Sequence, residues 1–326
     1  MKKKRFWISL VISAVLLYFA LRRIQSADVL LALQGTRLEL LLLAALVRVA
    51  LALVRAFRWQ TLLTPATRRI SLGVLFRTWL VGFFGNYTLP SESGEILKLY
   101  ALGRQEHVSR TAILGTLFLE RVSDVLILSL SLIALLLTLP LPAWVGQLGW
   151  LAAGLWIAGL GLLLALATRR EVATLWADRL LRKLMPPLAD WGLARFGFFV
   201  EGLNALRSLR VFGASLGLSV VVWGVQLLPF ILVGGAMGLA IPAYGYLLLM
   251  VVFNLASLVP ALPGRLGTLE FVFATVLALF QADQSLAFSY ALLFRVTHLL
   301  PLLLGGIFFV AGERAGEATE LRASDR

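Results

Sequence analysis

The 326-residue sequence contains no cysteine, which excludes disulfide bonds, thiolate metal sites and cysteine nucleophiles. It has only two histidines, and neither a His-Glu zinc motif nor a serine nucleophile elbow occurs. A nucleotide-binding loop of the G-x-x-x-x-G-K type is also absent. We therefore expect no catalytic residues, no bound metal and no other cofactor, and we do not expect this chain to be an enzyme.

Charged residues make up only 14% of the chain, whereas hydrophobic residues make up 60% and the mean hydropathy is +0.90. These values lie outside the usual range of soluble domains. About 20 apolar residues cross a bilayer as a helix, and the richness in Leu, Ala and Gly favours helices over barrel strands. The predicted fold class is an all-α polytopic membrane protein. Six full spans are predicted, at Phe6–Leu21, Leu38–Phe57, Thr111–Leu139, Leu148–Thr168, Val211–Leu239 and Leu286–Val310.

The net charge of +13 comes from basic residues that concentrate at the N-terminus and in the loops between these runs. Membrane proteins retain such positive charge on the cytoplasmic side, so the charge does not indicate nucleic-acid binding. We expect a protein of the cell (inner, cytoplasmic) membrane with both termini in the cytoplasm. The basic segments that predict the inner side are residues 2–5, 58–69, 98–110 and 169–210.

The predicted domain organisation is simple. Residues 1–312 are expected to form a single transmembrane domain, and residues 313–326 a polar cytoplasmic tail. Within the domain, residues 171–207 alternate apolar and basic positions at helical spacing. This pattern predicts an interfacial amphipathic segment that is attracted to anionic lipid.

Two further apolar segments, 70–102 and 244–281, are too long for one span and are interrupted by Pro, Gly and polar residues. The loops that flank each segment are assigned to one side of the membrane, so each segment must enter and return. We expect two re-entrant broken-helix hairpins of opposite orientation. Non-helical backbone at membrane depth must be buried in protein or line a watery cavity, and inverted pairs of breaks are typical of transporter substrate sites.

The first break, "NYTLPSESG", runs from Asn86 to Gly94. Ser91 or Ser93 is expected to cap the following helix. The carboxylates of Glu92 and Glu95 lie near its start. They either cap the helix and pair with Lys98, or burial raises their pKa and permits proton coupling.

The second break runs from Pro260 to Gly267, with Thr268 as the expected N-cap and Glu270 in the first turn of the next helix. Arg265 lies inside this break. A helix start presents unpaired N–H groups and the positive end of a dipole, which attract phosphate and carboxylate groups. Both breaks are therefore predicted to attract anions.

Charged residues also occur within the predicted spans. Glu120, Arg121 and Asp124 share one stretch, "LERVSD", and are predicted to form a self-neutralising cluster. This cluster is either an ion pair that holds helices together or a proton or headgroup relay. Arg295 and His298 lie three residues apart on one face of the last span, and His298 is either a hydrogen-bonded packing residue or a proton carrier.

Four stretches resemble, in order and spacing, the lysylphosphatidylglycerol synthase transmembrane-region family, the flippase-like domain also found in the multiple peptide resistance factor. They are "GNYTLPSESGEILKLYAL", "LERVSDVL", "VPALPGRLGTLEFVF" and "LLFRVTHLLPLLLGG". The resemblance covers roughly residues 5–312 and implies a membrane domain that moves lipids or lipid-linked headgroups between leaflets. Relatives often carry a second glycine after Pro-Gly, where this chain has Arg265. The soluble synthase domain of some relatives is not in this sequence, so aminoacyl transfer is not expected from it.

We therefore expect a lipid flippase or transporter in which a phosphate-bearing headgroup binds between the two breaks. The lipid is expected to be an anionic phospholipid or a polyprenyl-phosphate-linked lipid. The alternative is a non-transporting membrane partner that presents lipid to a separate glycosyl- or aminoacyl-transferase. The expected binding residues are Asn86, Pro90, Ser91, Gly94, Glu95, Arg121, Pro263, Gly264, Arg265, Gly267, Glu270 and Arg295. The expected proton or charge relay comprises Glu92, Glu95, Glu120, Asp124, Glu270 and His298.

Overall fold

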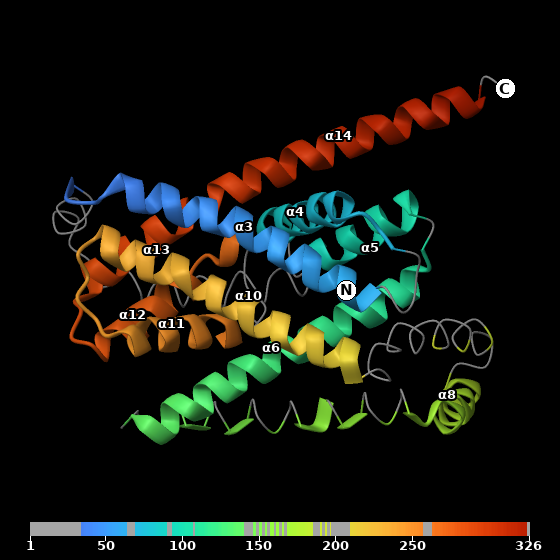
Figure 1. Cartoon of the computed structure of the whole chain (residues 1–326), viewed down its shortest axis with the longest axis horizontal. Helices are drawn as coiled ribbons and strands as arrows, with labels where there is room; N and C mark the ends of the chain where they lie inside the picture. The colour runs from blue at the N-terminus through green and yellow to red at the C-terminus, as the bar shows by residue number, and fades with distance from the viewer. Residues whose placement is uncertain are drawn as a thin grey trace. The chain divides into compact units, whose positions relative to one another are not determined.

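The computed structural model describes residues 34–63, 69–89, 93–106, 108–139, 168–184, 209–256 and 263–324, with isolated positions between 146 and 165 and at 190, 193 and 196. Every regular element in these ranges is a helix (Figure 1), which confirms the all-α prediction. The chain divides into two compact units. Unit 1 comprises residues 1–53, 76–98 and 224–326, and unit 2 comprises residues 54–75 and 99–223.

Four helical segments in the described ranges are long and apolar enough to cross a membrane. They are Leu38–Leu63, Ala112–Thr138, Arg210–Ala236 and Gln284–Gly312. Each overlaps a predicted span, and the last consists of two consecutive helices, α13 (Gln284–Val296) and α14 (Leu299–Ser324). The predicted span Phe6–Leu21 lies outside the described residues, as does most of Leu148–Thr168.

Helix α3 (Leu38–Leu63) is longer than the sequence predicted. The prediction that a basic loop begins at residue 58 is wrong, because the helix continues through Arg58 and Trp59. Both side chains are fully buried, and Trp59 Nε1 donates a 3.1 Å hydrogen bond to Thr116 Oγ1. The Trp59 indole N–H is therefore bonded to protein, where a loop would have placed it in water.

The first interrupted segment folds into α4 (Leu72–Thr88) and α5 (Ser93–Gln105). Gly82 lies beside Lys98, and Asn86 lies beside Gly94, so the two helices run antiparallel around the break. A Cβ atom at Gly94 would overlap the carbonyl oxygen of Gly82. Glycine is required here because the two helix backbones approach so closely. The reversal of the chain is confirmed, while its position in the membrane stays a prediction.

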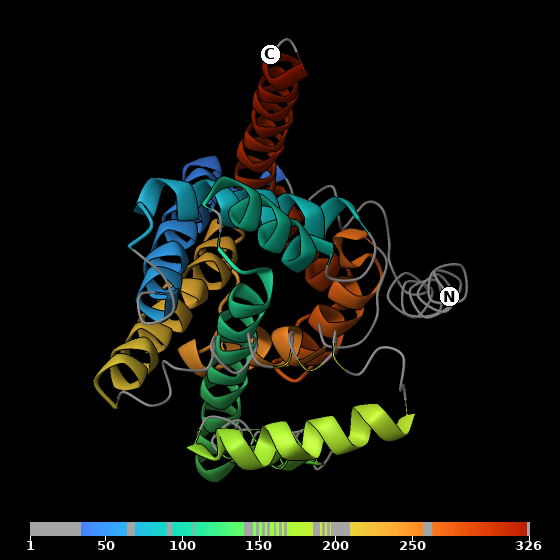
Figure 2. The same ribbon diagram turned by 90° about the vertical axis from the view of Figure 1, so that its right-hand side faces the viewer.

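The second interrupted segment folds into α11 (Ala243–Ala256), the short 3-10 turn η3 (Pro263–Arg265) and α12 (Thr268–Ala278). Helix α12 packs against both α11 and α13, and Figures 1 and 2 show α11 and α12 side by side.

An aromatic cluster forms the core between these helices of unit 1, with neighbouring ring centroids 4.4–6.2 Å apart. Its members are Phe230, Phe253, Phe273, Tyr290 and Phe294. Aromatic side chains bury a large apolar area and prefer such tilted and edge-to-face arrangements. The cluster therefore fixes the helices on either side of the second break.

Unit 2 contains α6 (Arg110–Thr138), α8 (Arg170–Leu184) and the first part of α10 (Leu209–Ala236). Helix α8 exposes Trp176 and Leu180, and it carries Arg179, Arg182 and Lys183 among the apolar positions. The helix prediction for the amphipathic segment is confirmed up to Leu184. Most of the remainder of 171–207 lies outside the described residues.

Candidate functional site

The first break is closed by a side chain of α4. Asn86 Oδ1 accepts a 2.9 Å hydrogen bond from the Gly94 backbone N–H. The amide oxygen thereby satisfies one of the N–H groups that the start of α5 leaves open. Ser93 is the first residue of α5, and Ser91 lies outside the described residues, so the contribution of Ser91 to capping stays a prediction.

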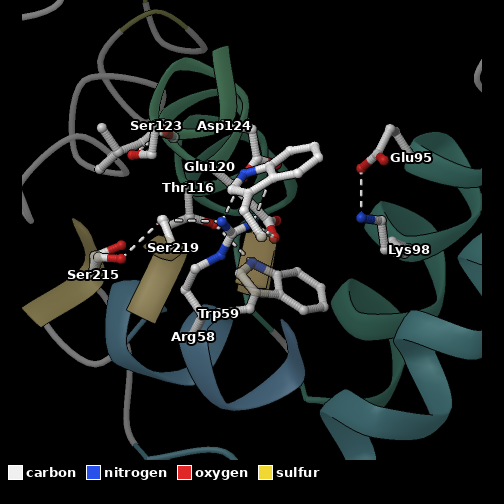
Figure 3. A network of polar contacts seen from close by, with 12 residues as sticks. Arg58, Trp59, Glu95, Lys98, Thr116, Glu120, Ser123, Asp124, Ser215 and Ser219 are labelled. Carbon is white, nitrogen blue, oxygen red and sulfur yellow. Dashed lines mark hydrogen bonds and ion pairs between the residues drawn. The ribbon is translucent and has the colours of Figure 1, made fainter. Parts of the chain in front are cut away.

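Glu95, in the first turn of α5, is paired with Lys98 (Figure 3). Lys98 Nζ lies 2.7 Å from Glu95 Oε2, and the lysine side chain is buried while the glutamate is partly exposed. For Glu95 this is the pairing that the sequence analysis gave as one alternative, whereas Glu92 lies outside the described residues. The carboxylate offsets the lysine charge at the close approach of α4 and α5, since Gly82 lies against the Lys98 side chain.

The backbone of the second break is left-handed at three nearby positions. The φ angles are 67° at Gly264, 56° at Arg265 and 81° at Gly267. Glycine adopts such angles freely, whereas a residue with a side chain loses roughly 1–2 kcal/mol. The Arg265 guanidinium lies 5.2 Å from the Phe253 ring centroid, and this cation–π contact offsets part of that strain.

Glu270 and Arg295 form the charged centre of the second break. Arg295 Nη2 donates to Glu270 Oε1 at 2.5 Å, and Arg295 Nη1 donates to the Gly264 carbonyl oxygen at 2.5 Å. The other Glu270 oxygen, Oε2, accepts a 2.8 Å hydrogen bond from the Gly267 N–H. The prediction that Thr268 is the N-cap is wrong, because Gly267 holds that position and Glu270 satisfies it from the first turn.

The two breaks meet within unit 1. A Cβ atom built on Gly264 would lie 3.4 Å from Tyr87 Cε1 in α4, and 3.2 Å from Arg295 Nη1. The Tyr87 ring also stacks on His298, with 5.6 Å between the ring centroids. The end of α4, the turn of the second break and the last predicted span therefore converge on one small region.

His298 lies at the junction of α13 and α14. Its ring stacks on Phe83 of α4 and meets the Phe294 ring edge-on, and its Nδ1 lies 2.9 Å from the Phe294 carbonyl oxygen. Arg48 of α3 donates from Nε to Thr297 Oγ1 at 2.7 Å, and its guanidinium lies 4.4 Å from the Phe294 ring centroid. These contacts agree with the alternative in which His298 is a hydrogen-bonded packing residue.

A second charged cluster lies in unit 2 and is centred on Arg58 (Figure 3). Arg58 is fully buried, and it contacts two acidic residues of α6, Glu120 and Asp124, which are 6% and 8% exposed. Arg58 Nη1 donates to Asp124 Oδ1 at 2.5 Å, and Nη2 donates to Glu120 Oε1. Ser219 Oγ accepts from Arg58 at 3.0 Å, and Trp223 Nε1 donates to Asp124 at 3.0 Å. The cluster therefore joins α3, α6 and α10.

The cation that bonds to both Glu120 and Asp124 is Arg58, which the sequence analysis did not identify. Arg121 is exposed, whereas Arg58 occupies the space between the two carboxylates. Adjacent residues on a helix point about 100° apart, so Arg121 cannot share the buried face of Glu120. The missed signal was Trp59, Leu62 and Leu63, whose apolar pattern continues the helix beyond Phe57.

The structure thus brings together most of the expected binding residues within unit 1, at or beside the two breaks. Arg121, Glu120 and Asp124 belong to unit 2 instead. Pro90, Ser91 and Glu92 lie outside the described residues, and Pro263 is described only by its backbone. Sequence reasoning missed Tyr87, which links the two breaks, because an aromatic residue next to a break is also expected from packing alone.

Comparison with known proteins agrees with the four motifs. A family model described as the lysylphosphatidylglycerol synthase TM region matches residues 6–306. The chain is 23% identical over 297 residues to a UPF0104 membrane protein of Methanothermobacter thermautotrophicus, and the alignment covers 85% of each chain. A UPF0104 membrane protein of Pyrococcus horikoshii is 22% identical over 298 residues, which are 85% of this chain and 88% of that one. The chain is therefore an integral membrane protein that belongs to the lysylphosphatidylglycerol synthase TM region family.

Proposed function

We propose that this protein moves a phosphate-bearing lipid between the leaflets of the cell membrane. The observation that carries the proposal is the contact between the two breaks, where Tyr87 of the first hairpin lies against Gly264 of the second. Broken helices that meet inside a bundle are the arrangement in which transporters bind polar substrates at membrane depth. Membership of a membrane-domain family supports a role at the lipid bilayer.

The charges of the second break suit a single anionic group. Arg265 and Arg295 bring guanidinium groups to this break, where Arg295 already pairs with Glu270. The start of α12 adds the positive end of a helix dipole. A phosphodiester is an anion that guanidinium groups and helix starts bind, so such a headgroup suits the break while its acyl chains stay in the surrounding lipid.

The proposed orientation makes the site reachable from both leaflets. The two hairpins are re-entrant and enter from opposite faces, the N-terminus is cytoplasmic, and the headgroup passes through the region where the breaks meet. The chain transports the lipid without modifying it chemically. An anionic phospholipid and a polyprenyl-phosphate-linked lipid both carry the required phosphate, and the transport assay compares them.

The test is lipid scrambling in proteoliposomes that contain the purified protein and a fluorescent phosphatidylglycerol. Dithionite destroys the fluorophore in the outer leaflet, so transport increases the bleached fraction beyond that of protein-free vesicles. We expect transport by the unchanged protein and a large loss for Arg295→Gln. Arg182→Gln removes one positive charge from exposed helix α8 and serves as the matched control, with transport unchanged.

Lack of transport for phosphatidylglycerol, phosphatidylethanolamine and a fluorescent polyprenyl phosphate alike would contradict the proposal. Lipid that copurifies with a protein inactive in this assay would favour the alternative of a partner that presents lipid to a separate transferase. Equal transport by Arg295→Gln and the unchanged protein would separate lipid movement from the second break.

A further inference from the structure

Two buried hydroxyl groups, one at the end of α4 and one at the start of α12, have no hydrogen-bond partner in the described part of the chain. They are Thr268 Oγ1 and Tyr87 Oη. Thr268 as a whole is only 3% exposed. Most buried hydroxyls in folded proteins are bonded to protein or to ordered water, so two such groups beside the breaks require an explanation.

Both residues that carry these hydroxyl groups neighbour the turn of the second break. Thr268 directly follows Gly267 and is the first residue of α12, which is an 11-residue helix. Tyr87 comes from α4, and its ring lies against Gly264. The Gly264 carbonyl oxygen is held by Arg295, which also holds Glu270. One donor therefore follows the Gly267 cap that Glu270 satisfies, and the ring that carries the other lies against Gly264, whose carbonyl oxygen bonds Arg295.

The existing contacts of Glu270 show what kind of group this centre binds. One carboxylate oxygen of Glu270 accepts from the Gly267 N–H and the other from Arg295. The centre thus binds an anion through a backbone N–H and a guanidinium, and here that anion belongs to the protein itself. A phosphate has more acceptor oxygens than a carboxylate, and it can use hydroxyl donors that Glu270 leaves without a partner.

We propose that the Tyr87 and Thr268 hydroxyls donate hydrogen bonds to the phosphate oxygens of a lipid headgroup and determine the selectivity of the site for phosphate. This inference rests on the proposed function and adds two specificity-determining residues to it. Arg295 supplies the positive charge, and the two hydroxyls supply hydrogen bonds whose geometry favours the oxygens of a phosphate. The ligand class is a phosphate monoester or diester attached to a lipid.

Substitutions that remove only the hydroxyl group distinguish a ligand role from a structural role. Tyr87→Phe and Thr268→Val keep the shape of the side chain, and no hydrogen bond within the described structure is lost. Thermal stability without ligand should therefore stay the same or rise, since a buried group without a partner is removed. Tyr290→Phe is the contrast, because Tyr290 Oη donates to the Phe230 carbonyl oxygen at 2.6 Å and its loss should lower stability.

Binding is measured by native mass spectrometry and by ligand-induced thermal shifts of the full chain in detergent. The probes are phosphatidylglycerol, a polyprenyl phosphate, a diacylglycerol without phosphate, and inorganic phosphate. We expect the phosphate lipids to bind and each of Tyr87→Phe and Thr268→Val to weaken that binding about tenfold or more, as for a hydrogen bond to a charged group. Ser129→Ala removes a buried, partnerless hydroxyl of α6 outside both breaks and should leave binding unchanged.

Four results would overturn the inference. The first is unchanged phosphate-lipid affinity in both variants. The second is loss of stability equal to that of Tyr290→Phe, which would assign the hydroxyls a structural role. The third is binding of diacylglycerol as tight as that of phosphatidylglycerol, and the fourth is tighter binding of inorganic phosphate than of either lipid. If the unchanged protein scrambles lipid while any of these holds, the proposed function stands and only the role of the hydroxyls is wrong.

Discussion

Removal of Arg58 should destabilise the protein far more than removal of any exposed arginine. Arg58 is fully buried and contacts Glu120 and Asp124, which are themselves buried. In Arg58→Met both carboxylates lose their cation, and they face each other one helical turn apart on α6. Breaking a buried ion pair by removing one partner costs about 3–5 kcal/mol. We expect the free energy of unfolding to fall by at least that amount.

The magnitude rests on uncompensated charge, so neutralising the acids should restore stability. The triple variant Arg58→Met, Glu120→Gln, Asp124→Asn removes all three charges and keeps side chains of similar size. Replacing buried ions by neutral groups is often nearly neutral, so this variant should regain part of the loss, although nearby Arg55 then loses the charge of both acids. Trp223 Nε1 remains as a hydrogen-bond donor to the side chain at position 124.

The assay is unfolding of the purified protein in mixed micelles of increasing sodium dodecyl sulfate content, followed by the fluorescence of its nine tryptophans. Arg121→Met is the matched control, because Arg121 is the exposed neighbour of Glu120 and exposed charges contribute about 1 kcal/mol or less. A loss below about 1 kcal/mol for Arg58→Met would refute the reasoning. A triple variant no more stable than Arg58→Met would refute it as well.

Three further predictions concern the backbone and the surface. Gly264→Ala should lower the free energy of unfolding by about 1–2 kcal/mol in the same assay, since alanine is strained at a φ of 67°. Gly213→Ala is the control, because Gly213 lies in open space on α10 and the change should be neutral or stabilising. Asn86→Ala should cost about 0.5–2 kcal/mol through the lost cap on Gly94, and Asn86→Asp, which keeps an acceptor oxygen, should cost less. Because the chain lacks cysteine, single spin labels at Leu180→Cys and Arg182→Cys report on α8 alone. In anionic proteoliposomes, the label at position 180 should be accessible to oxygen dissolved in the bilayer. The label at position 182 should be accessible to a water-soluble nickel reagent. Equal accessibility at both positions would exclude an interfacial α8.

Hydropathy was sufficient to predict the described long helices, because about 20 consecutive apolar residues have few alternatives to a spanning helix. The breaks were also predictable from Pro, Gly and polar residues inside apolar segments. The end of α3 was not, since the predicted loop was inferred from charge. From the sequence alone, Arg58 is predicted to be a loop residue. Only the structure shows that its two acidic partners, 62 and 66 positions later, lie beside it.

The candidate site shows the same division between local and long-range information. Asn86, Gly94, Glu95, Gly267 and Glu270 were identified because their role is local to a break. The pairing of Glu270 with Arg295 depends on packing between α12 and α13, and the contact between Tyr87 and Gly264 joins segments that lie far apart in sequence. Such contacts depend on tertiary packing, which the periodicity of a single segment does not contain.

The most direct measurement asks whether the two breaks meet in the bilayer. In the cysteine-free chain, Thr88→Cys and Leu266→Cys place labels at two exposed positions next to the Tyr87–Gly264 contact. Both cysteines are labelled with pyrene maleimide, and emission is recorded from proteoliposomes at a protein density of less than one molecule per vesicle. Excimer emission from the doubly labelled protein, absent from a mixture of the two singly labelled proteins, is the expected result. Monomer emission alone would show that the breaks lie apart, and the proposed lipid site between them would then not exist.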